Sequence, residues 1–194
     1  MLVSIIIPYI RGEKAYDLAD SLSGLTGAKD FSTWLRPDKT RIGCPKMVKI
    51  LTDQCNSDLV CFLGDDSLPQ KNFLKEAIHC MSLMHEGWGL VGFNDRTGRT
   101  LPTHWLAHKK LLPHLGGEFF HTGYKHCYCD NELQTRAMEI GRYRWCEKAV
   151  VLHDHPLING AAYDEDYKRV YSQEYLRHDA ELFQKRLKAG FPNE

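Results

Sequence analysis

Apolar residues along this chain gather in short, nearly unbroken runs, which alternate with longer segments of helical periodicity. The runs cover residues 2–8, 59–63, 88–93 and 149–152. Each run is too short for an ordinary helix and is typical of a strand that is buried on both faces. Because strands and helices alternate, the pattern predicts an α/β fold with right-handed βαβ units and a mostly parallel, twisted sheet flanked by helices.

Helices are predicted where apolar residues recur at spacings of three and four. These segments are residues 15–22, 45–55, 73–84, 130–140 and 167–188. Ser67 and Gln70 stand at capping-box spacing around Pro69, so the third helix is expected to open at that proline.

Other segments give a weaker pattern. Residues 28–43 mix apolar side chains with Pro37 and Gly43, and a short second strand is expected there. Residues 99–128 are rich in His and aromatic side chains, which indicates strands and loops over a pocket. We expect residues 1–160 to form one domain. Residues 161–194 should form a C-terminal helical extension, packed on that domain or mediating a dimer with a partner chain.

Composition narrows the protein class. The 194 residues contain 25 Lys plus Arg and 25 Asp plus Glu, so no overall charge draws the chain to nucleic acid or to an anionic membrane. The seven Cys residues lack the spacing of a disulfide framework. There is no basic leader before the first strand and no apolar run of roughly 20 residues. These features predict a soluble, cytoplasmic protein without a signal peptide or transmembrane segment.

Two adjacent carboxylates follow the central run of residues 59–63. Gly64 ends that run, and Asp65 and Asp66 come next. Ligands of open α/β sheets bind at the carboxyl ends of strands, where paired carboxylates suit Mn²⁺ or Mg²⁺. An ordinary turn or helix cap is the alternative for an isolated Asp pair.

Three stretches together resemble the inverting glycosyltransferases of family 2, which have the GT-A fold. Residues 3–9 are similar to the opening strand of that family, which ends in Pro. Residues 62–69 are similar to its Asp-x-Asp segment. In the third stretch an acidic residue precedes Leu, Arg and Gly at the spacing of the family: Asp130, Leu133, Arg136 and Gly141. The resemblance covers about residues 2–155, and the small size of the chain is similar to bacteriophage members.

The resemblance implies a metal-dependent, inverting transfer of a sugar from a nucleoside-diphosphate sugar, with a UDP-sugar as the expected donor, to an acceptor hydroxyl. It assigns Asp130 as the catalytic base, and Asp66 with His153, or with His155 in its place, as ligands of Mn²⁺ or Mg²⁺. The residues expected at the donor are Pro8, Tyr9, Arg41, Lys46 and Asp65. The acceptor is expected to be a saccharide or a hydroxymethylated base in DNA.

The chain also departs from the family pattern. The metal segment reads Gly64-Asp65-Asp66, and Cys129 stands beside Asp130 where the family has an acidic pair. For the second-strand Asp that binds the nucleotide base, Asp30 and Asp38 are the candidates. Two aromatic residues are candidates either for stacking on a sugar or base, or for the core. They are Trp105 and Tyr124.

Two other functions fit parts of the sequence. The first is a zinc module, although its Cys-x-Cys spacing differs from the usual Cys-x₂₋₄-Cys. Its ligands would come from Cys127, Cys129, Cys146, His153 and His155. The second is a catalytically inactive nucleotide-binding protein on the same fold, because a fold does not fix a function.

Overall fold

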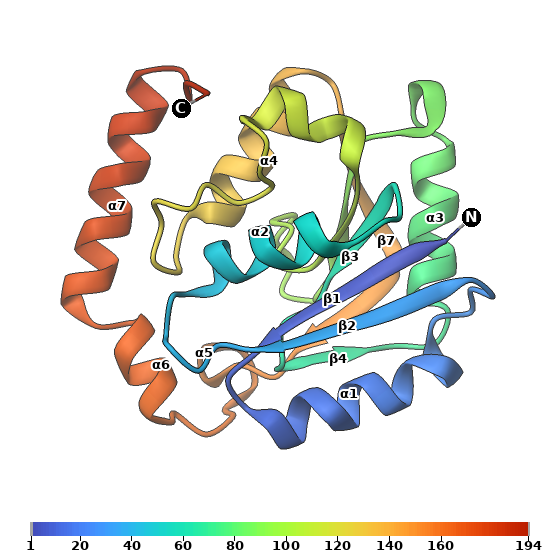
Figure 1. Ribbon diagram of the computed structural model, residues 1–194, viewed down its shortest axis with the longest axis horizontal. Coiled ribbons are helices and arrows are strands. Elements are labelled where there is room, and N and C mark those ends of the chain that lie inside the picture. The colour runs from blue at the N-terminus through green and yellow to red at the C-terminus, as the bar shows by residue number, and fades with distance from the viewer. Residues whose placement is uncertain (1, 194) are drawn as a thin grey trace.

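The computed structural model describes residues 2–193, without the side chains of residues 157 and 159, and folds them around one sheet (Figure 1). Over this range the sheet has seven strands in the order β2-β1-β3-β6-β5-β7-β4. The strands are β1 (Val3–Tyr9), β2 (Phe31–Pro37), β3 (Leu59–Phe62), β4 (Ser67–Pro69), β5 (Leu90–Asn94), β6 (Trp105–His108) and β7 (Tyr143–His153).

The sheet is mixed, with most strands pointing the same way. Strand β1 pairs in parallel with β2 and β3, and β5 pairs in parallel with β7. Strand β6 runs antiparallel between β3 and β5, and β4 runs antiparallel to β7. Hence β1, β2, β3, β5 and β7 share one direction, and the predicted α/β class with a mostly parallel sheet is confirmed.

Helices cover both faces of this sheet (Figure 1). They are α1 (Gly12–Leu25), α2 (Cys44–Gln54), α3 (Phe73–Ser82), α4 (Cys129–Glu139), α5 (Pro156–Asn159), α6 (Glu165–Val170) and α7 (Gln173–Lys188), with 3₁₀ segments η1 (His85–Gly87) and η2 (Lys109–Leu115). Ile5 and Ile7 of β1 pack in a core cluster with α1 and α3, whereas Ile6 packs in a second cluster with α2 and α4. Successive side chains of a strand point to opposite faces, and burying each isoleucine stabilises the fold by about 2 kcal/mol.

The expected capping box at Ser67 and Gln70 is wrong. Residues 67–69 form β4 instead, because their backbone pairs with β7 and the amide of Gln70 donates to the carbonyl of Val150. The Ser67 hydroxyl donates to the carbonyl of Gly64 at 2.6 Å. Helix α3 therefore begins only at Phe73.

Two other elements differ from their predicted bounds. The single helix expected over residues 167–188 is wrong, since it breaks into α6 and α7 at Ser172, whose hydroxyl accepts from the amide of Tyr175. Serine favours the first position of a new helix for this reason. Strand β7 starts at Tyr143, well before the predicted residue 149. The short second strand expected within residues 28–43 is confirmed as β2.

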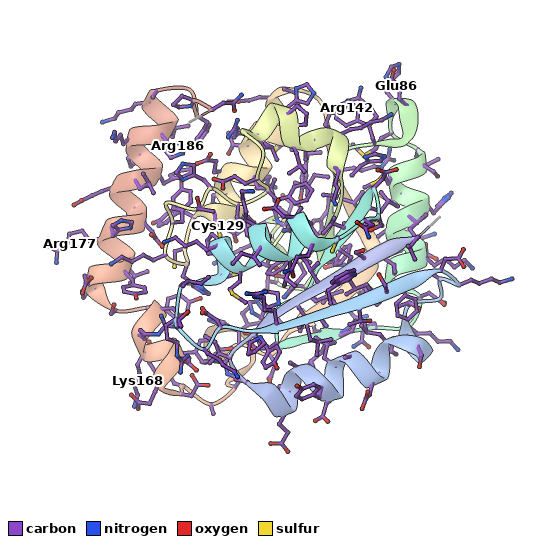
Figure 2. All side chains as sticks on the ribbon, viewed as in Figure 1. Glu86, Cys129, Arg142, Lys168, Arg177 and Arg186 are labelled. Atoms are coloured by element: carbon purple, nitrogen blue, oxygen red, sulfur yellow. The ribbon has the colours of Figure 1, made fainter. Side chains whose placement is uncertain are left out.

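The C-terminal helices contact the rest of the same chain through buried polar groups. The carboxylate of Asp179 in α7 has no exposed surface and accepts the amide protons of residues 125–127 at 2.7–2.8 Å. The guanidinium of Arg186 donates to Glu132 of α4 at 2.8 and 2.9 Å. By contrast, Lys168 and Arg177 point outward from α6 and α7 (Figure 2). No helix in the described part of the chain has the length and apolar character needed to cross a membrane.

Candidate metal centre and active site

A pocket of about 400 Å³ lies where several strands end. Strand β1 brings Tyr9 to it, the turn after β3 brings Asp65 and Asp66, and β7 ends there with His153. This is the edge at which open α/β sheets bind ligands. Asp130, at the start of α4, lines the same pocket. The structure therefore brings the acidic pair, the histidine and the distant carboxylate into one cavity.

Asp66 is held by two donors. Its Oδ2 atom accepts the Tyr167 hydroxyl at 2.6 Å and lies 3.2 Å from Nε2 of His153. Burial acts to raise the pKa of Asp66, but the hydrogen bonds from His153 and Tyr167, with the charge of His153, hold it well below its usual range. Burial acts to lower the pKa of His153, but the hydrogen bond to Asp66 and the charge of Asp66 raise it above its usual value. Asp66 is therefore an anion at any physiological pH.

A third potential ligand, His104, completes a compact group with Asp66 and His153. One ligand atom from each of the three lies within 4.8 Å of the others. His104 immediately precedes β6 and is only 2% exposed. Burial and the nearby charge of His153 lower the pKa of His104 to about 3, so its imidazole is neutral and keeps a lone pair for a metal. Sequence reasoning missed His104, because it lies in the irregular segment where only an abundance of His was visible.

The surroundings of this group suit a bound cation. The Nδ1 atoms of His104 and His153 are buried and have no hydrogen-bond partner within residues 2–193. Gly64 leaves room beside Asp66 and His104: a Cβ atom there would lie 2.7 Å from Oδ1 of Asp66 and 3.4 Å from Nε2 of His104. One carboxylate and two imidazoles form an ordinary donor set for a divalent transition metal. The residues present therefore fit a divalent metal ion.

Asp65 has a structural partner in the loop after β1. Its Oδ2 atom accepts the amide protons of Ile10 and Arg11, both at 2.8 Å, and its Oδ1 atom pairs with the Arg11 guanidinium at 2.8 Å. Arg11 also pairs with Asp164 at 2.7 Å and lies 4.4 Å from the ring centre of Tyr167. Asp65 thus fixes one wall of the pocket, and Arg11 joins that wall to the C-terminal segment. No motif or periodicity in the sequence singles out Arg11.

Asp130 has an environment opposite to that of Asp66. It is half-buried, and its Oδ1 atom accepts the amide proton of Asn131 at 2.9 Å. Burial raises the pKa of Asp130 to about 6, although nearby backbone amides oppose the shift. A carboxylate with a pKa in this range is mostly ionised at neutral pH and is a better proton acceptor than an ordinary Asp.

The remaining residues predicted at the donor divide between two cavities. Pro8 and Tyr9 line the pocket, whereas Arg41 and Lys46 line a neighbouring cavity of about 300 Å³. Of the two second-strand candidates, Asp38 follows β2 and lines the pocket, whereas Asp30 precedes that strand. The carboxylate of Asp38 accepts the amide protons of residues 42 and 43, both at 2.9 Å.

Trp105 and Tyr124 belong to the core and do not line the pocket. Trp105 is fully buried, and Tyr124 is 1% exposed and donates its hydroxyl proton to Glu132 at 2.8 Å. The core alternative is therefore confirmed for both. Aromatic side chains that sequence reasoning did not assign to the site line the pocket instead, among them Phe62, Phe120, Tyr128, Tyr167 and Tyr171.

The zinc module is wrong. Cys146 belongs to the core cluster on one face of the sheet and Cys129 to the cluster on the other, so they cannot share a metal ion. In the part of the chain that the structure describes, the group that could hold a metal contains no Cys. All seven thiols are free; five are buried, and those of Cys44 and Cys127 are half-buried.

No protein-family model and no curated protein matches this sequence. Solved structures do match its fold. Residues 1–349 of S. aureus TarS in complex with UDP are 17% identical, with a TM-score of 0.61, over 93% of this chain and 72% of that chain. Against the S. aureus TarS structure of greater length, the chain covers 43% of the neighbour.

Two further neighbours carry a nucleotide and a metal ion. The mannosyltransferase PcManGT from Pyrobaculum calidifontis, in complex with GDP-Man and Mn²⁺, is 15% identical with a TM-score of 0.65, over 94% of this chain and 64% of that chain. Glucosyl-3-phosphoglycerate synthase from Mycobacterium tuberculosis, in complex with Mn²⁺, UDP and phosphoglyceric acid, is 14% identical with a TM-score of 0.61. That match covers 91% of this chain and 76% of the synthase. The chain therefore adopts the GT-A fold of glycosyltransferases.

Proposed function

We propose that this protein is a metal-dependent glycosyltransferase, which moves a sugar from a nucleoside-diphosphate sugar to an acceptor hydroxyl with inversion at the anomeric carbon. One observation carries the proposal. The same pocket holds the compact group of Asp66, His104 and His153 and a separate carboxylate, Asp130, whose pKa is raised to about 6. Structural neighbours in complex with UDP or GDP-Man and Mn²⁺ support the assignment of the pocket.

Asp66, His104 and His153 would hold the metal ion. A divalent cation bound by these residues would offset the negative charge that develops on the leaving diphosphate. Mg²⁺ prefers an all-oxygen octahedral shell, so the two imidazoles favour Mn²⁺ over Mg²⁺. The low pKa of Asp66 keeps its carboxylate available to the cation.

Asp130 is the proposed base. Its carboxylate takes the proton of the acceptor hydroxyl while the acceptor oxygen bonds to the anomeric carbon. The bond from that carbon to the diphosphate oxygen breaks, and its electron pair leaves with the nucleoside diphosphate. Because the acceptor attacks the face opposite the leaving group in a single displacement, the configuration inverts.

The nucleotide end of the pocket is assigned to the loops after β1 and β2. Pro8, Tyr9 and Asp38 line this end, and Asp65 holds the first loop in place through the amides of residues 10 and 11. We propose a UDP-sugar as the donor. The acceptor is a saccharide or a hydroxymethylated base in DNA, and the zero net charge of the chain favours the saccharide.

A thermal-shift panel tests the function. Purified protein is melted with UDP-, GDP-, dTDP- and CMP-linked sugars, with Mn²⁺, with Mg²⁺ and with neither. A UDP-sugar with Mn²⁺ should raise the melting temperature, because a ligand that binds only the folded state stabilises it by mass action. Asp66→Asn should abolish the shift, and Asp53→Asn, on the exposed surface of α2, should leave it unchanged. The absence of a shift with every nucleotide would contradict the proposal.

Measuring the release of the nucleoside diphosphate distinguishes an active glycosyltransferase from a catalytically inactive nucleotide-binding protein. Wild-type protein with Mn²⁺ and a UDP-sugar should release UDP faster when a mixture of candidate glycans is added. Binding without release, with any acceptor class including hydroxymethylated DNA, would assign the chain to the non-catalytic alternative.

A further inference from the structure

The cavity beside the pocket is lined by cations and by no carboxylate among the residues described. Its basic side chains come from three separate stretches of the chain, which are the loop before α2 with the first turn of α2, the loop before α4, and helices α6 and α7. These side chains are Arg41, Lys46, Lys125, Arg169 and His178. Segments so distant in sequence converge here only through the tertiary fold, so the cluster is more than one solvated helix face.

Neighbouring carboxylates neutralise this cluster only in part. Arg41 pairs with Asp166, and Arg169 lies 3.9 Å from the same carboxylate. Lys125 pairs at 2.8 Å with Glu174, whose side chain is 78% exposed. A third carboxylate, Asp179, lies 2.9 Å from Nδ1 of His178. Three carboxylates thus face four permanently charged side chains and one histidine.

Unused donors remain in the cavity. No ion pair involves Lys46 within residues 2–193, and the Nε atom of Arg169 is buried without a hydrogen-bond partner. Helix α2 also begins here, directly after Gly43, with Lys46 and no acidic residue in its first turn, so its dipole adds to the positive potential. An anion in this cavity would meet charge and hydrogen-bond donors that the protein itself does not satisfy.

The cavity adjoins the pocket but excludes the metal group. Gly43, Lys125 and Arg169 line both spaces, whereas Asp66, His104 and His153 line only the pocket. A diphosphate that is neutralised by the metal must lie beside those three ligands. An anion in the basic cavity is therefore a different one.

The geometry points to the acceptor as the source of that anion. We propose that the basic cavity binds a phosphate or carboxylate group of the molecule that receives the sugar; this inference rests on the proposed function. Lys125 stands five positions before Asp130, on a segment whose amides are fixed by the buried Asp179. An acceptor held at Lys125 would thus have a fixed relation to the base. A cavity of about 300 Å³ fits a single anionic group, not the row of phosphates along a duplex.

A titration with inorganic phosphate tests the cavity. The protein is first saturated with Mn²⁺ and UDP, so that the metal is covered, and phosphate binding is then followed by calorimetry. Wild-type protein should bind phosphate. Lys46→Gln and Arg169→Gln should each weaken that binding about tenfold, the usual cost of one charge-assisted hydrogen bond. Lys46→Gln, whose side chain lines only this cavity, should leave the affinity for UDP with Mn²⁺ unchanged. Lys49→Gln is the matched control on α2, because Lys49 pairs with Asp53 outside the cavity. The Lys49→Gln protein should bind phosphate with the affinity of the wild type.

Three results would overturn the inference. They are an absence of phosphate binding to the wild type, equal binding by the wild type and Lys46→Gln, and a parallel loss of UDP and phosphate affinity, which would assign the cavity to the donor. The UDP titration with Mn²⁺ is a separate readout. If UDP fails to bind the wild type, the proposed function and the acceptor assignment fall together. If UDP binds and phosphate does not, only the basic cavity is rejected.

Discussion

Asp66 and Asp130 line one pocket, yet their environments drive their pKa values in opposite directions. Asp66 accepts hydrogen bonds from His153 and Tyr167, and these donors with the charge of His153 outweigh its burial. Asp130 is also desolvated, but backbone amides oppose the shift only in part, and its pKa rises to about 6. Two chemically identical side chains therefore suit different tasks: one remains an anion to bind a cation, and the other can take up a proton.

The two ends of the pocket also depend on different C-terminal helices. Helix α6 supplies Tyr167 to Asp66, and Asp164 just before it pairs with Arg11. Helix α7 supplies Asp179, which fixes the backbone of residues 125–127 before α4. The break between α6 and α7 lets one C-terminal segment reach both ends. Each carboxylate can therefore be perturbed separately, which makes the contrast testable.

Asp130→Asn should cause the largest loss. The amide cannot take the proton of the acceptor, so turnover should fall by about 10²- to 10⁴-fold, the usual contribution of a general base. Affinity for UDP with Mn²⁺ should stay near that of the wild type, because the metal group is unchanged. Steady-state kinetics and a binding titration on the same preparation measure both quantities.

A stability measurement serves as the control for this substitution. Because the folded-state pKa of Asp130 lies above its unfolded value, the carboxyl group favours folding below the unfolded pKa, and this contribution is lost as pH rises through about 6. Asp130→Asn should therefore melt at pH 8 no lower than the wild type. Glu139→Gln, at the exposed end of α4, should keep full turnover. If Asp130→Asn retains wild-type turnover, Asp130 is not the base.

The pH dependence of kcat/KM should show the next largest effect. Activity needs ionised Asp130, so at saturating Mn²⁺ the value should fall about tenfold per pH unit below pH 6, or about a hundredfold at pH 4. Asp66 stays ionised over this range, because its hydrogen bonds hold its pKa well below the usual value. An acid limb centred near pH 4 would show that Asp130 is not desolvated in the working enzyme.

The contrast between the two carboxylates explains how far the sequence could predict this site. Asp66 and Asp130 were found from the sequence because each stands at a fixed place beside a strong local pattern, a buried strand or a spaced helix motif. His104 follows no such pattern, and it reaches the metal group only because β6 runs antiparallel beside β3. Sequence periodicity gives the elements but not which strands become neighbours, so tertiary partners such as Arg11 and Tyr167 were missed.

The same limit applies to the fold. Buried strands and amphipathic helices carry their own periodicity, which is why the α/β class and the second strand were predicted. Strand β4 has three residues and is defined by its pairing with β7, not by its own pattern. The break at Ser172 depends on one hydroxyl that caps α7 within an otherwise continuous amphipathic stretch. Contacts of this kind are decided by tertiary structure and leave little trace in hydrophobic spacing.

His104→Gln tests whether His104 binds the metal ion together with Asp66. Loss of an imidazole ligand should weaken Mn²⁺ binding by about a hundredfold, the upper end of what even outer partners of metal ligands contribute. Turnover at saturating Mn²⁺ should recover most of the wild-type value, because Asp130 is unchanged. His108→Gln, at the other end of β6, is the control and should leave the Mn²⁺ dependence unaltered. Equal Mn²⁺ affinity in the wild type and His104→Gln would limit the metal group to Asp66 and His153.

Tyr167→Phe should have the smallest effect, and it tests whether the Tyr167 hydroxyl acts through the metal site. The substitution keeps the ring that lies 4.4 Å from the Arg11 guanidinium but removes the hydroxyl that donates to Asp66 at 2.6 Å. Without that donor the pKa of Asp66 rises and its carboxylate is less firmly oriented. Mn²⁺ affinity should then fall about tenfold, with little change in kcat at saturating metal.

Tyr163→Phe is the matched control for this last substitution. Tyr163 is exposed and stacks on Tyr167 at 6.3 Å between ring centres, so Tyr163→Phe removes a hydroxyl from the same aromatic stack without touching Asp66. Its Mn²⁺ dependence should equal that of the wild type. A lower kcat in Tyr167→Phe with unchanged Mn²⁺ dependence would show that the hydroxyl does not act through Asp66. The depressed pKa of Asp66 would then rest on His153 and His104, and Tyr167 would only line the pocket.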